Sequence, residues 1–339
     1  MNETSAPIFA FLPEGELAPG EAPEYEFDPR CRYIGPEDGA LRARMFLPGD
    51  FDADSVPHKR LNVRYGALEQ QMLDVFYPNG GEGPFPLIFY IHGGGWILGD
   101  RHSNSIACIL SGALRRGFAV ATVDYRLAPG ARFPENLWDA KTAVRWARAN
   151  AAEYRFDPSR FGVIGDSAGG YFALMLAVTA GNPALEGGQY GWPEASSAVQ
   201  AACSLYGPVD MERDWSEYYA ASGVKRLPLK LKGHPQMEEF EFCAESARAL
   251  MPLVCPHRYV HPDMPPVLLL HGESDGVVPY QNSVLIFERI RVVCGEGRAK
   301  LLLYPERNHS DRDFMTEESA DLAAEFFARV FRGEAPFDA

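Results

Sequence analysis

A serine stands between two glycines in the stretch GDSAGG, which places Ser167 two residues after Gly165 and two before Gly169. An apolar run precedes this G-x-S-x-G pattern and a longer one follows, as expected where a strand turns sharply into a helix. Such a turn strains the serine backbone and lifts its hydroxyl above the sheet edge. Free N–H groups at the start of the following helix favour a negative charge there. The pattern predicts a nucleophile at Ser167; a plain tight turn is the alternative.

A serine hydroxyl needs a general base, and the base needs a carboxylate to orient it. Asp275 and His309 each follow a later apolar run, in PVLLLHGESDGVVP and LLLYPERNHS. When a G-x-S-x-G turn carries the nucleophile, the acid and then the histidine follow it along the chain. We therefore predict that His309 is the base and Asp275 the acid. The alternative is that both are ordinary polar residues of loops.

Other polar residues compete for these two roles. Glu273 shares a loop with Asp275, but Asp275 lies in the turn that leads into VVP. His271 ends a strand and is expected to be packed, and Asp311 is expected to cap the last helix. The remaining histidines lack a preceding strand or the required chain order. His309 and Asp275 therefore stay the preferred pair.

A tetrahedral transition state carries an oxyanion, which needs backbone donors. The motif HGGGW follows the apolar run PLIFYI, and its glycines let the chain turn N–H groups into a cleft. We predict that Gly93 and Gly94 donate to the oxyanion together with the N–H of Ala168. A glycine-rich phosphate loop is the alternative, but no GK[ST] sequence follows.

Composition and charge narrow the class of protein. Net charge is −14, from 32 Lys and Arg against 46 Asp and Glu, which disfavours nucleic acid and anionic membranes as partners. The six cysteines lack zinc-like spacing, so we expect buried or half-buried thiols in a reducing compartment and no metal. The N-terminal segment lacks the features of a secretory signal, and no apolar run is long enough to span a bilayer. We expect a cytoplasmic protein.

Alternating strands and helices predict the fold class. Six apolar runs without polar alternation are typical of strands buried on both faces: PLIFYI, FAVATV, FGVIGD, AACSLY, PVLLLH and AKLLLY. Helical periodicity marks the segments at 105–117, 135–154, 282–295 and 319–331. The segments LNVRYG and QQMLDVFYP are expected to form an antiparallel pair. The pattern predicts an α/β fold, a mostly parallel sheet with helices on both faces.

Two segments fall outside this alternation. Residues 1–58 are rich in Pro, Gly, Glu and Asp and are interpreted as an N-terminal arm that contributes to a cap, leaving 59–339 as the main domain. Residues 211–258 are interpreted as a small helical cap insertion over the sheet edge where ligands bind. Five aromatic residues are candidates for a substrate pocket, with plain packing as the alternative: Trp96, Phe172, Trp215, Tyr218 and Tyr219.

The motifs HGGGW, DYRLAP, GDSAGG, HGESDGVVP and NHS together resemble the hormone-sensitive-lipase-like branch of the α/β-hydrolase esterases. The likeness covers residues 70–332 apart from the insertion. It implies the α/β-hydrolase fold, Ser167 as nucleophile, Asp275 as acid, His309 as base, and an oxyanion hole at Gly93, Gly94 and Ala168. In the DYRLAP motif it implies structural roles for the aspartate and the arginine, which we expect to be ion-pair partners.

The expected activity is that of a serine carboxylesterase acting on short acyl esters, including acetylated sugars or small aryl esters, with no cofactor. One alternative is amide hydrolysis, by an arylformamidase or a small peptidase with the same triad. The other is a non-catalytic binding protein of the same fold. The expected partner is a small ester substrate, and a homodimer is open.

Overall fold

The computed structural model describes most of the chain beyond its first 55 residues. It covers residues 56–96, 98–103, 106–128, 130–131, 133–211 and 251–338. The predicted arm at 1–58 therefore lies outside the described residues except for 56–58, and the predicted cap at 211–258 lies outside them except for 211 and 251–258.

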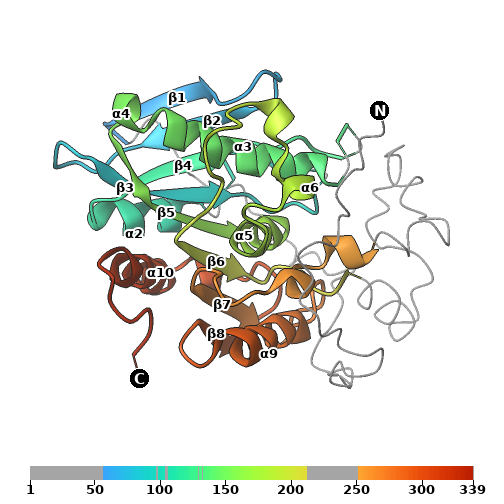
Figure 1. Cartoon of the computed structure of the whole chain (residues 1–339). Helices are drawn as coiled ribbons and strands as arrows, with labels where there is room; N and C mark the ends of the chain where they lie inside the picture. The colour runs from blue at the N-terminus through green and yellow to red at the C-terminus, as the bar shows by residue number, and fades with distance from the viewer. Residues whose placement is uncertain are drawn as a thin grey trace, which may run out of the picture.

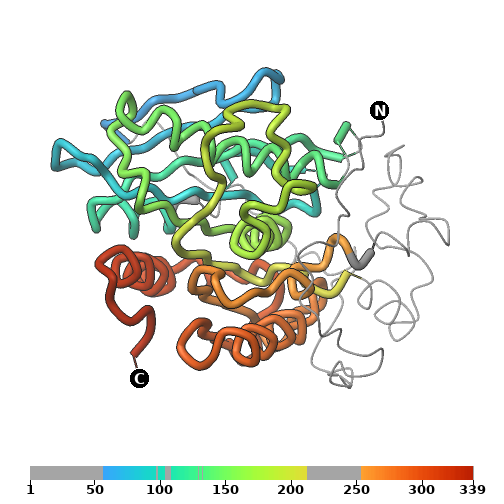
Figure 2. The backbone as a smooth tube through the Cα atoms, viewed as in Figure 1, coloured from blue at the N-terminus to red at the C-terminus, as the bar shows by residue number. Residues whose placement is uncertain are grey.

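A single eight-stranded sheet forms the centre of the molecule, in the order β1-β2-β4-β3-β5-β6-β7-β8 (Figure 1). The strands are β1 (Lys59–Arg64), β2 (Met72–Phe76), β3 (Phe85–Ile91), β4 (Ala119–Val123), β5 (Phe156–Asp166), β6 (Ala201–Leu205), β7 (Val267–Gly272) and β8 (Ala299–Tyr304). Only the pairs β1–β2 and β2–β4 are antiparallel. Figure 2 shows the blue N-terminal segments of the described chain on one side of the molecule and the orange and red C-terminal segments on the other.

Helices cover both faces of the sheet (Figure 1). The α-helices are α2 (Ile106–Arg115), α3 (Glu135–Ala149), α4 (Ala151–Tyr154), α5 (Ala168–Val178), α6 (Pro183–Glu186), α9 (Gln281–Cys294) and α10 (Glu317–Phe331), and short 3₁₀ turns are η2 (Gly188–Tyr190), η3 (Met251–Val254), η4 (Pro256–Tyr259) and η5 (Arg312–Met315). One core contains side chains of α3, α5 and α9, and the other contains side chains of α2 and α10. The expected two-faced α/β architecture is confirmed.

Burial explains why the apolar runs form strands. Every residue of β3, β4, β6 and β7 is buried, because helices cover both faces of these inner strands. The edge strand β1 alternates between half-buried and exposed residues, and β8 at the other edge is half-buried throughout. The predicted antiparallel pair corresponds to β1 and β2.

Two predicted boundaries are wrong. The helix expected over 135–154 is interrupted at Asn150, which lies between α3 and α4 and whose side-chain amide donates to the backbone carbonyl of Trp146. The strand expected to begin at Phe161 begins at Phe156 instead, because Phe156 pairs with Phe85 of β3. Both differences come from hydrogen bonding that apolar periodicity does not report.

Strand register brings one set of strand ends to a common edge. Ile91 pairs with Gly165, and Asp166 with Leu205. Since β7 and β8 are parallel to these strands, their ends lie at the same edge. The loops after β3, β5, β6, β7 and β8 therefore meet above it, and they carry the residues predicted to do chemistry.

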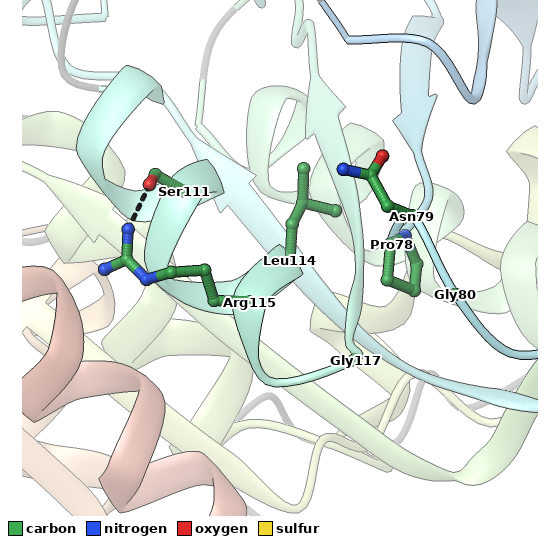
Figure 3. A pocket seen from close by; sticks show the side chains of 7 residues that line it. All are labelled: Pro78, Asn79, Gly80, Ser111, Leu114, Arg115 and Gly117. Carbon is green, nitrogen blue, oxygen red and sulfur yellow. Dashed lines mark hydrogen bonds between the residues drawn. The ribbon is translucent and has the colours of Figure 1, made fainter.

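A hollow of about 480 Å³ lies near the opposite edge, by the end of β2 and the start of β4 (Figure 3). Its lining residues are Pro78, Asn79, Gly80, Ser111, Leu114, Arg115 and Gly117. The Arg115 guanidinium is held by Ser111 and Asp321. None of the predicted site residues lines it, so the hollow is separate from the predicted site.

Two sequence-based expectations concern the state of the cysteines and the presence of a membrane-spanning segment. Cys203 and Cys255 are buried and Cys108 and Cys294 half-buried, whereas Cys31 and Cys243 lie outside the described residues. Among the residues that the structure describes, no cluster of three or more His, Cys, Asp or Glu could hold a metal ion. None of the helices found in that part of the chain is long and apolar enough to cross a membrane.

Candidate active site

The turn between β5 and α5 presents Ser167 at the sheet edge. Ser167 has φ 53° and ψ −118°, a conformation that is costly for a residue with a side chain. The turn is held by the Ser167 N–H, which donates to the carbonyl of Leu205 at 2.9 Å. A Cβ on Gly165 would lie 2.4 Å from the backbone of Gly169, and one on Gly169 would lie 1.9 Å from the Ile91 carbonyl oxygen. The two glycines are therefore required by close backbone approach, as the motif predicts.

Gly169→Ala is expected to damage both stability and activity, because its methyl group would displace the backbone of β3 or of the serine turn. We expect a loss of about 1–3 kcal/mol in the free energy of unfolding, and at least a ~100-fold fall in kcat from misplacement of the nucleophile. Gly80→Ala is the matched control, since its Cβ would meet nothing within 4 Å. Urea unfolding and ester hydrolysis of the two variants test this. Similar behaviour of the two would contradict the role given to the turn.

Three side chains from separate loops meet above this turn. His309 Nε2 lies 2.9 Å from the Ser167 hydroxyl, and His309 Nδ1 lies 2.7 Å from Asp275 Oδ2. Asp275 is fully buried and His309 is 4% exposed, so water competes little for these hydrogen bonds. Serine, histidine and aspartate thus form one hydrogen-bonded chain, in which the ring can take the hydroxyl proton from one side while the carboxylate orients the other.

The Asp275 carboxylate accepts hydrogen bonds at both oxygens. Oδ1 accepts from the N–H groups of Val277 and Val278, each at 2.8 Å, and Oδ2 accepts from His309 and from His271 Nε2 at 3.2 Å. Burial alone would raise the pKa of this carboxyl, but the charges and hydrogen bonds of His309 and His271 outweigh it and hold the pKa well below its usual range. The carboxylate is therefore ionised wherever the protein is folded near neutral pH.

This lowered pKa makes part of the stability depend on pH. An unfolded Asp titrates near pH 3.9, so the contribution of Asp275 is fully present above about pH 4 and is lost as the pH falls below it. We expect the difference in unfolding free energy between wild type and Asp275→Asn to shrink between pH 5 and pH 3. Urea titrations at several pH values measure it. A difference that stays constant, or grows on acidification, would contradict the assignment.

His271 is completely buried in β7, which confirms the expectation that it is packed. Its contact with Asp275 has no counterpart in the sequence pattern. His271 Nε2 lies 2.9 Å from the Val278 carbonyl oxygen, and Nδ1 lies 2.7 Å from the Ser283 hydroxyl. Because the Val278 carbonyl can only accept, Nε2 carries a proton and donates it, and Nδ1 is hydrogen-bonded to the Ser283 hydroxyl. His271 thus holds the loop that carries Asp275 through contacts with Asp275 and with the Val278 carbonyl.

Asn308 links the loop that carries Asp275 to the loop that carries His309. Its Oδ1 accepts from the backbone N–H of Gly276 at 3.1 Å and from that of His309 at 2.7 Å. The ring of Tyr206, which follows β6, lies edge-on to the His309 ring with centroids 4.8 Å apart. The position of Asn308 directly before His309 is the only sequence signal for this role.

One predicted oxyanion donor is already engaged. The Gly93 N–H donates to Asp166 Oδ1 at 3.2 Å, so it is not free for a substrate oxygen, and the expectation for Gly93 is wrong on this geometry. The N–H groups of Gly94, Gly95 and Ala168 donate no hydrogen bond to any residue that the structure describes. Gly95 therefore replaces Gly93 as a candidate donor.

Neighbouring peptide groups fix where these donors point. In a trans peptide the N–H points opposite to the C=O of the preceding residue. The Gly93 carbonyl lies 2.7 Å from His92 Nδ1, which orients the Gly94 N–H. The Gly94 carbonyl accepts from the Leu98 N–H at 3.1 Å, which orients the Gly95 N–H. Burial lowers the pKa of His92, which keeps its ring neutral.

The DYRLAP residues have the structural roles expected of them. Arg126 forms a two-pronged ion pair with buried Asp139, with Nε 2.8 Å from Oδ2 and Nη2 3.0 Å from Oδ1. Asp124 pairs with Arg101, which follows the loop at residues 92–99 that carries the predicted oxyanion donors, here called the oxyanion loop. These pairs fasten the loops beside the serine turn to α3 and to the sheet.

The competing residues lie elsewhere. The Glu273 backbone N–H donates to the Tyr304 carbonyl, and Asp275, not Glu273, is bonded to the histidine. Asp311 caps the short turn η5 by accepting from the Asp313 N–H. The cap of α10 is Thr316, so the expectation that Asp311 caps that helix is wrong.

The predicted pocket aromatics have mixed outcomes. Trp96 is half-buried in the oxyanion loop, with its ring edge-on to Tyr171 at 5.4 Å. Phe172 is completely buried in the core beside Tyr125 and Tyr171, so the packing alternative holds for it. Three further candidates lie outside the described residues: Trp215, Tyr218 and Tyr219.

Comparisons with known proteins find relatives that are named esterases. The sequence is 30% identical over 308 residues to Esterase LipC of Mycobacterium tuberculosis, which is 89% of this chain and 70% of that protein. It is 29% identical over 247 residues to Esterase LipQ of the same organism, covering 72% of this chain but only 52% of LipQ. The chain thus spans about two thirds of one such relative and half of the other.

A solved structure described as a truncated carbohydrate esterase from gut microbiota superposes with a TM-score of 0.66 and 25% identity. The match covers 82% of this chain and 98% of that one. The sequence model of the BD-FAE family matches residues 73–290, which include the serine and the acid but end before the histidine. The chain therefore belongs to the BD-FAE family and has the fold of the α/β-hydrolase esterases.

Proposed function

We propose that this protein is a serine carboxylesterase that hydrolyses short-chain acyl esters through a covalent acyl-enzyme. The hydrogen-bonded chain from the Ser167 hydroxyl through His309 to the ionised Asp275 carries the proposal. The relatives named esterases support ester hydrolysis as the general activity.

The reaction starts when His309 Nε2 takes the Ser167 proton and Oγ attacks the ester carbonyl carbon. The carbonyl π electrons move onto oxygen, and the N–H groups of Gly94, Gly95 and Ala168 bind this oxyanion. As the tetrahedral intermediate collapses, the C–O bond to the alcohol breaks and the alcohol takes the proton from His309. Water then adds to the acyl-serine with the same base, releasing the acid and restoring the serine.

Two exposed apolar side chains lie on the loops that carry the predicted oxyanion donors and the predicted acid. Leu98 and Val277, on the loops after β3 and β7, are exposed apolar side chains at 41% and 39%. They offer limited apolar surface beside the oxyanion loop and the loop that carries Asp275. We propose acetylated sugars or small aryl esters as substrates, and the carbohydrate esterase among the structural neighbours supports the first choice.

Substrate panels test the reaction class. We expect p-nitrophenyl acetate and butyrate to be hydrolysed at kcat/KM at least ten-fold above the dodecanoate, with acetylated sugars also cleaved. N-formylkynurenine and aminoacyl-p-nitroanilides test the amide alternatives, an arylformamidase or a small peptidase. A preference for either amide would overturn the ester assignment. Absence of all turnover would favour a non-catalytic binding protein.

A further inference from the structure

We propose that Asp166 is a positioning residue that fixes the oxyanion loop, and that it acts through a single carboxylate oxygen as an acceptor, not through its charge. The inference rests on the proposed function, because it names what aims the donors of that same site. Asp166 stands directly before the nucleophile, at the end of β5, and is only 6% exposed.

One oxygen of Asp166 joins two strands. Oδ1 accepts from the Tyr90 hydroxyl at 2.7 Å and from the Gly93 N–H at 3.2 Å. Tyr90 belongs to β3, and Gly93 lies in the loop that follows the same strand. Asp166 therefore ties the strand that carries the nucleophile to the loop that carries the oxyanion donors. Tyr90 holds the carboxyl in place, and the carboxyl holds Gly93.

The contact with Gly93 is close enough to require a glycine. A Cβ on Gly93 would lie 2.6 Å from Asp166 Oδ2 and 3.2 Å from Ser167 Cβ. The first peptide of the loop is also held on its other side, where the Tyr125 hydroxyl donates to the His92 carbonyl at 3.1 Å. The 92–93 peptide is thus clamped at its N–H by Asp166 and at its C=O by Tyr125.

The two hydrogen bonds to the 92–93 peptide also position the next two peptides, which carry the N–H groups of Gly94 and Gly95. The His92–Gly93 contact orients the Gly94 N–H, and the Leu98–Gly94 bond orients the Gly95 N–H. Both bonds are local, within the loop. From outside, the Trp96 carbonyl accepts from the Ala128 N–H at 2.8 Å and the Gly93 carbonyl from the Tyr125 hydroxyl at 3.4 Å, but these contacts tie the loop to the segment after β4 and not to the serine turn. It is the first peptide that connects the loop to the residue before the serine. Loss of the Asp166 acceptor would let both donors drift from the site of the oxyanion.

The charge of Asp166 is the competing explanation for its place beside the nucleophile. Burial raises the pKa of this carboxyl above its usual value, and the hydrogen bonds from the Tyr90 hydroxyl and the Gly93 N–H oppose this rise without cancelling it. An ionised Asp166 would stabilise a protonated His309 but would oppose a growing oxyanion. Because both donors use one oxygen, an asparagine carbonyl can accept both bonds without any charge.

The test compares Asp166→Ala, Asp166→Asn and Tyr90→Phe in the full chain, with p-nitrophenyl acetate as substrate. We expect Asp166→Ala to lower kcat by about 10²–10³, as for loss of an oxyanion donor, with KM within three-fold of wild type. Asp166→Asn should recover most of kcat. Tyr90→Phe should lower kcat three- to ten-fold, whereas Tyr77→Phe, which removes a hydroxyl bonded to the Tyr154 carbonyl, is the control and should not.

The inhibition constant of an aryl trifluoromethyl ketone distinguishes positioning of the oxyanion donors from a general effect on stability. Ser167 Oγ adds to its carbonyl carbon, the serine proton passes to His309, and the resulting oxyanion occupies the donor site. We expect the inhibition constant to rise in Asp166→Ala by the same factor as kcat falls. Binding of the neutral parent alcohol, which makes no oxyanion, should be unchanged.

Three outcomes would overturn the inference. Asp166→Ala with wild-type kcat is the first, and Asp166→Asn as poor as the alanine variant, which indicates a role of charge, is the second. The third is a lower melting temperature without any change in ketone affinity. If the alanine variant does not fold, Tyr90→Phe with unaltered kcat and ketone affinity overturns the inference as well. Failure of the proposed function is distinct, because wild type itself would then hydrolyse no ester.

Discussion

Ser167→Ala is expected to lower kcat for p-nitrophenyl acetate by about 10⁶, to the residual rate that oxyanion donors and binding alone support. The variant loses the Oγ that attacks the carbonyl carbon, and His309 is left with no hydroxyl to deprotonate. The fold should persist, because the backbone bond from residue 167 to the Leu205 carbonyl does not involve the side chain. Steady-state kinetics, together with thermal unfolding of both proteins, measures the change.

Ser159→Ala is the matched control, since its hydroxyl bonds only to the neighbouring Asp157 on the surface in the described part of the chain. It should keep wild-type kcat. A Ser167→Ala protein that is folded and hydrolyses the ester at a wild-type rate would show that this serine is not the nucleophile. Trace activity must be checked against wild-type contamination by titrating active sites.

Asp275→Asn is expected to have the second largest effect, a fall of about 10⁴ in kcat. The carboxylate accepts from two backbone N–H groups at Oδ1 and from two histidines at Oδ2. An amide has a single acceptor oxygen, so either the backbone pair or the histidine pair must face an NH₂ group. If that group faces His309, Nδ1 must accept, and the proton moves to Nε2, where the ring can no longer act as a base.

Asp157→Asn serves as a control for this variant, because it removes a carboxylate of the same kind on the surface. Kinetics with p-nitrophenyl acetate should show a wild-type kcat for the control and a KM little changed for Asp275→Asn. A loss below ten-fold in Asp275→Asn would mean that the carboxylate does not orient the base.

The elements that position the site were predictable because their signals are local. Six continuous apolar runs predicted strands buried on both faces, which is wrong only in burial for the edge strand β8, half-buried throughout. The spacing of Gly165, Ser167 and Gly169 predicted the sharp turn that follows one of these strands. Asp275 and His309 could be chosen because both directly follow such runs. Parallel strands end at one edge, so residues far apart in the chain could be expected to meet there.

The choice of oxyanion donors could not be made in this way. Three consecutive glycines look equivalent in sequence, and the N–H of Gly93 is engaged only because a carboxyl 73 positions away lies against it. The support of Asp275 by His271 likewise depends on how one loop folds back onto its own strand. Phe172 lies on the helix that follows Ser167, and only the packing of the helix and sheet layers decides that it points into the core.

Labelling with a fluorophosphonate tests the central claim most directly, because only a serine with an activated oxygen displaces fluoride from phosphorus. Intact-mass measurement and peptide mapping should find one adduct per chain, located on Ser167, absent from denatured protein and at least 10³-fold slower to form in His309→Ala. An esterase-active protein that carries no adduct, or one whose adduct maps to a different residue, would contradict the assignment of Ser167 as the activated nucleophile.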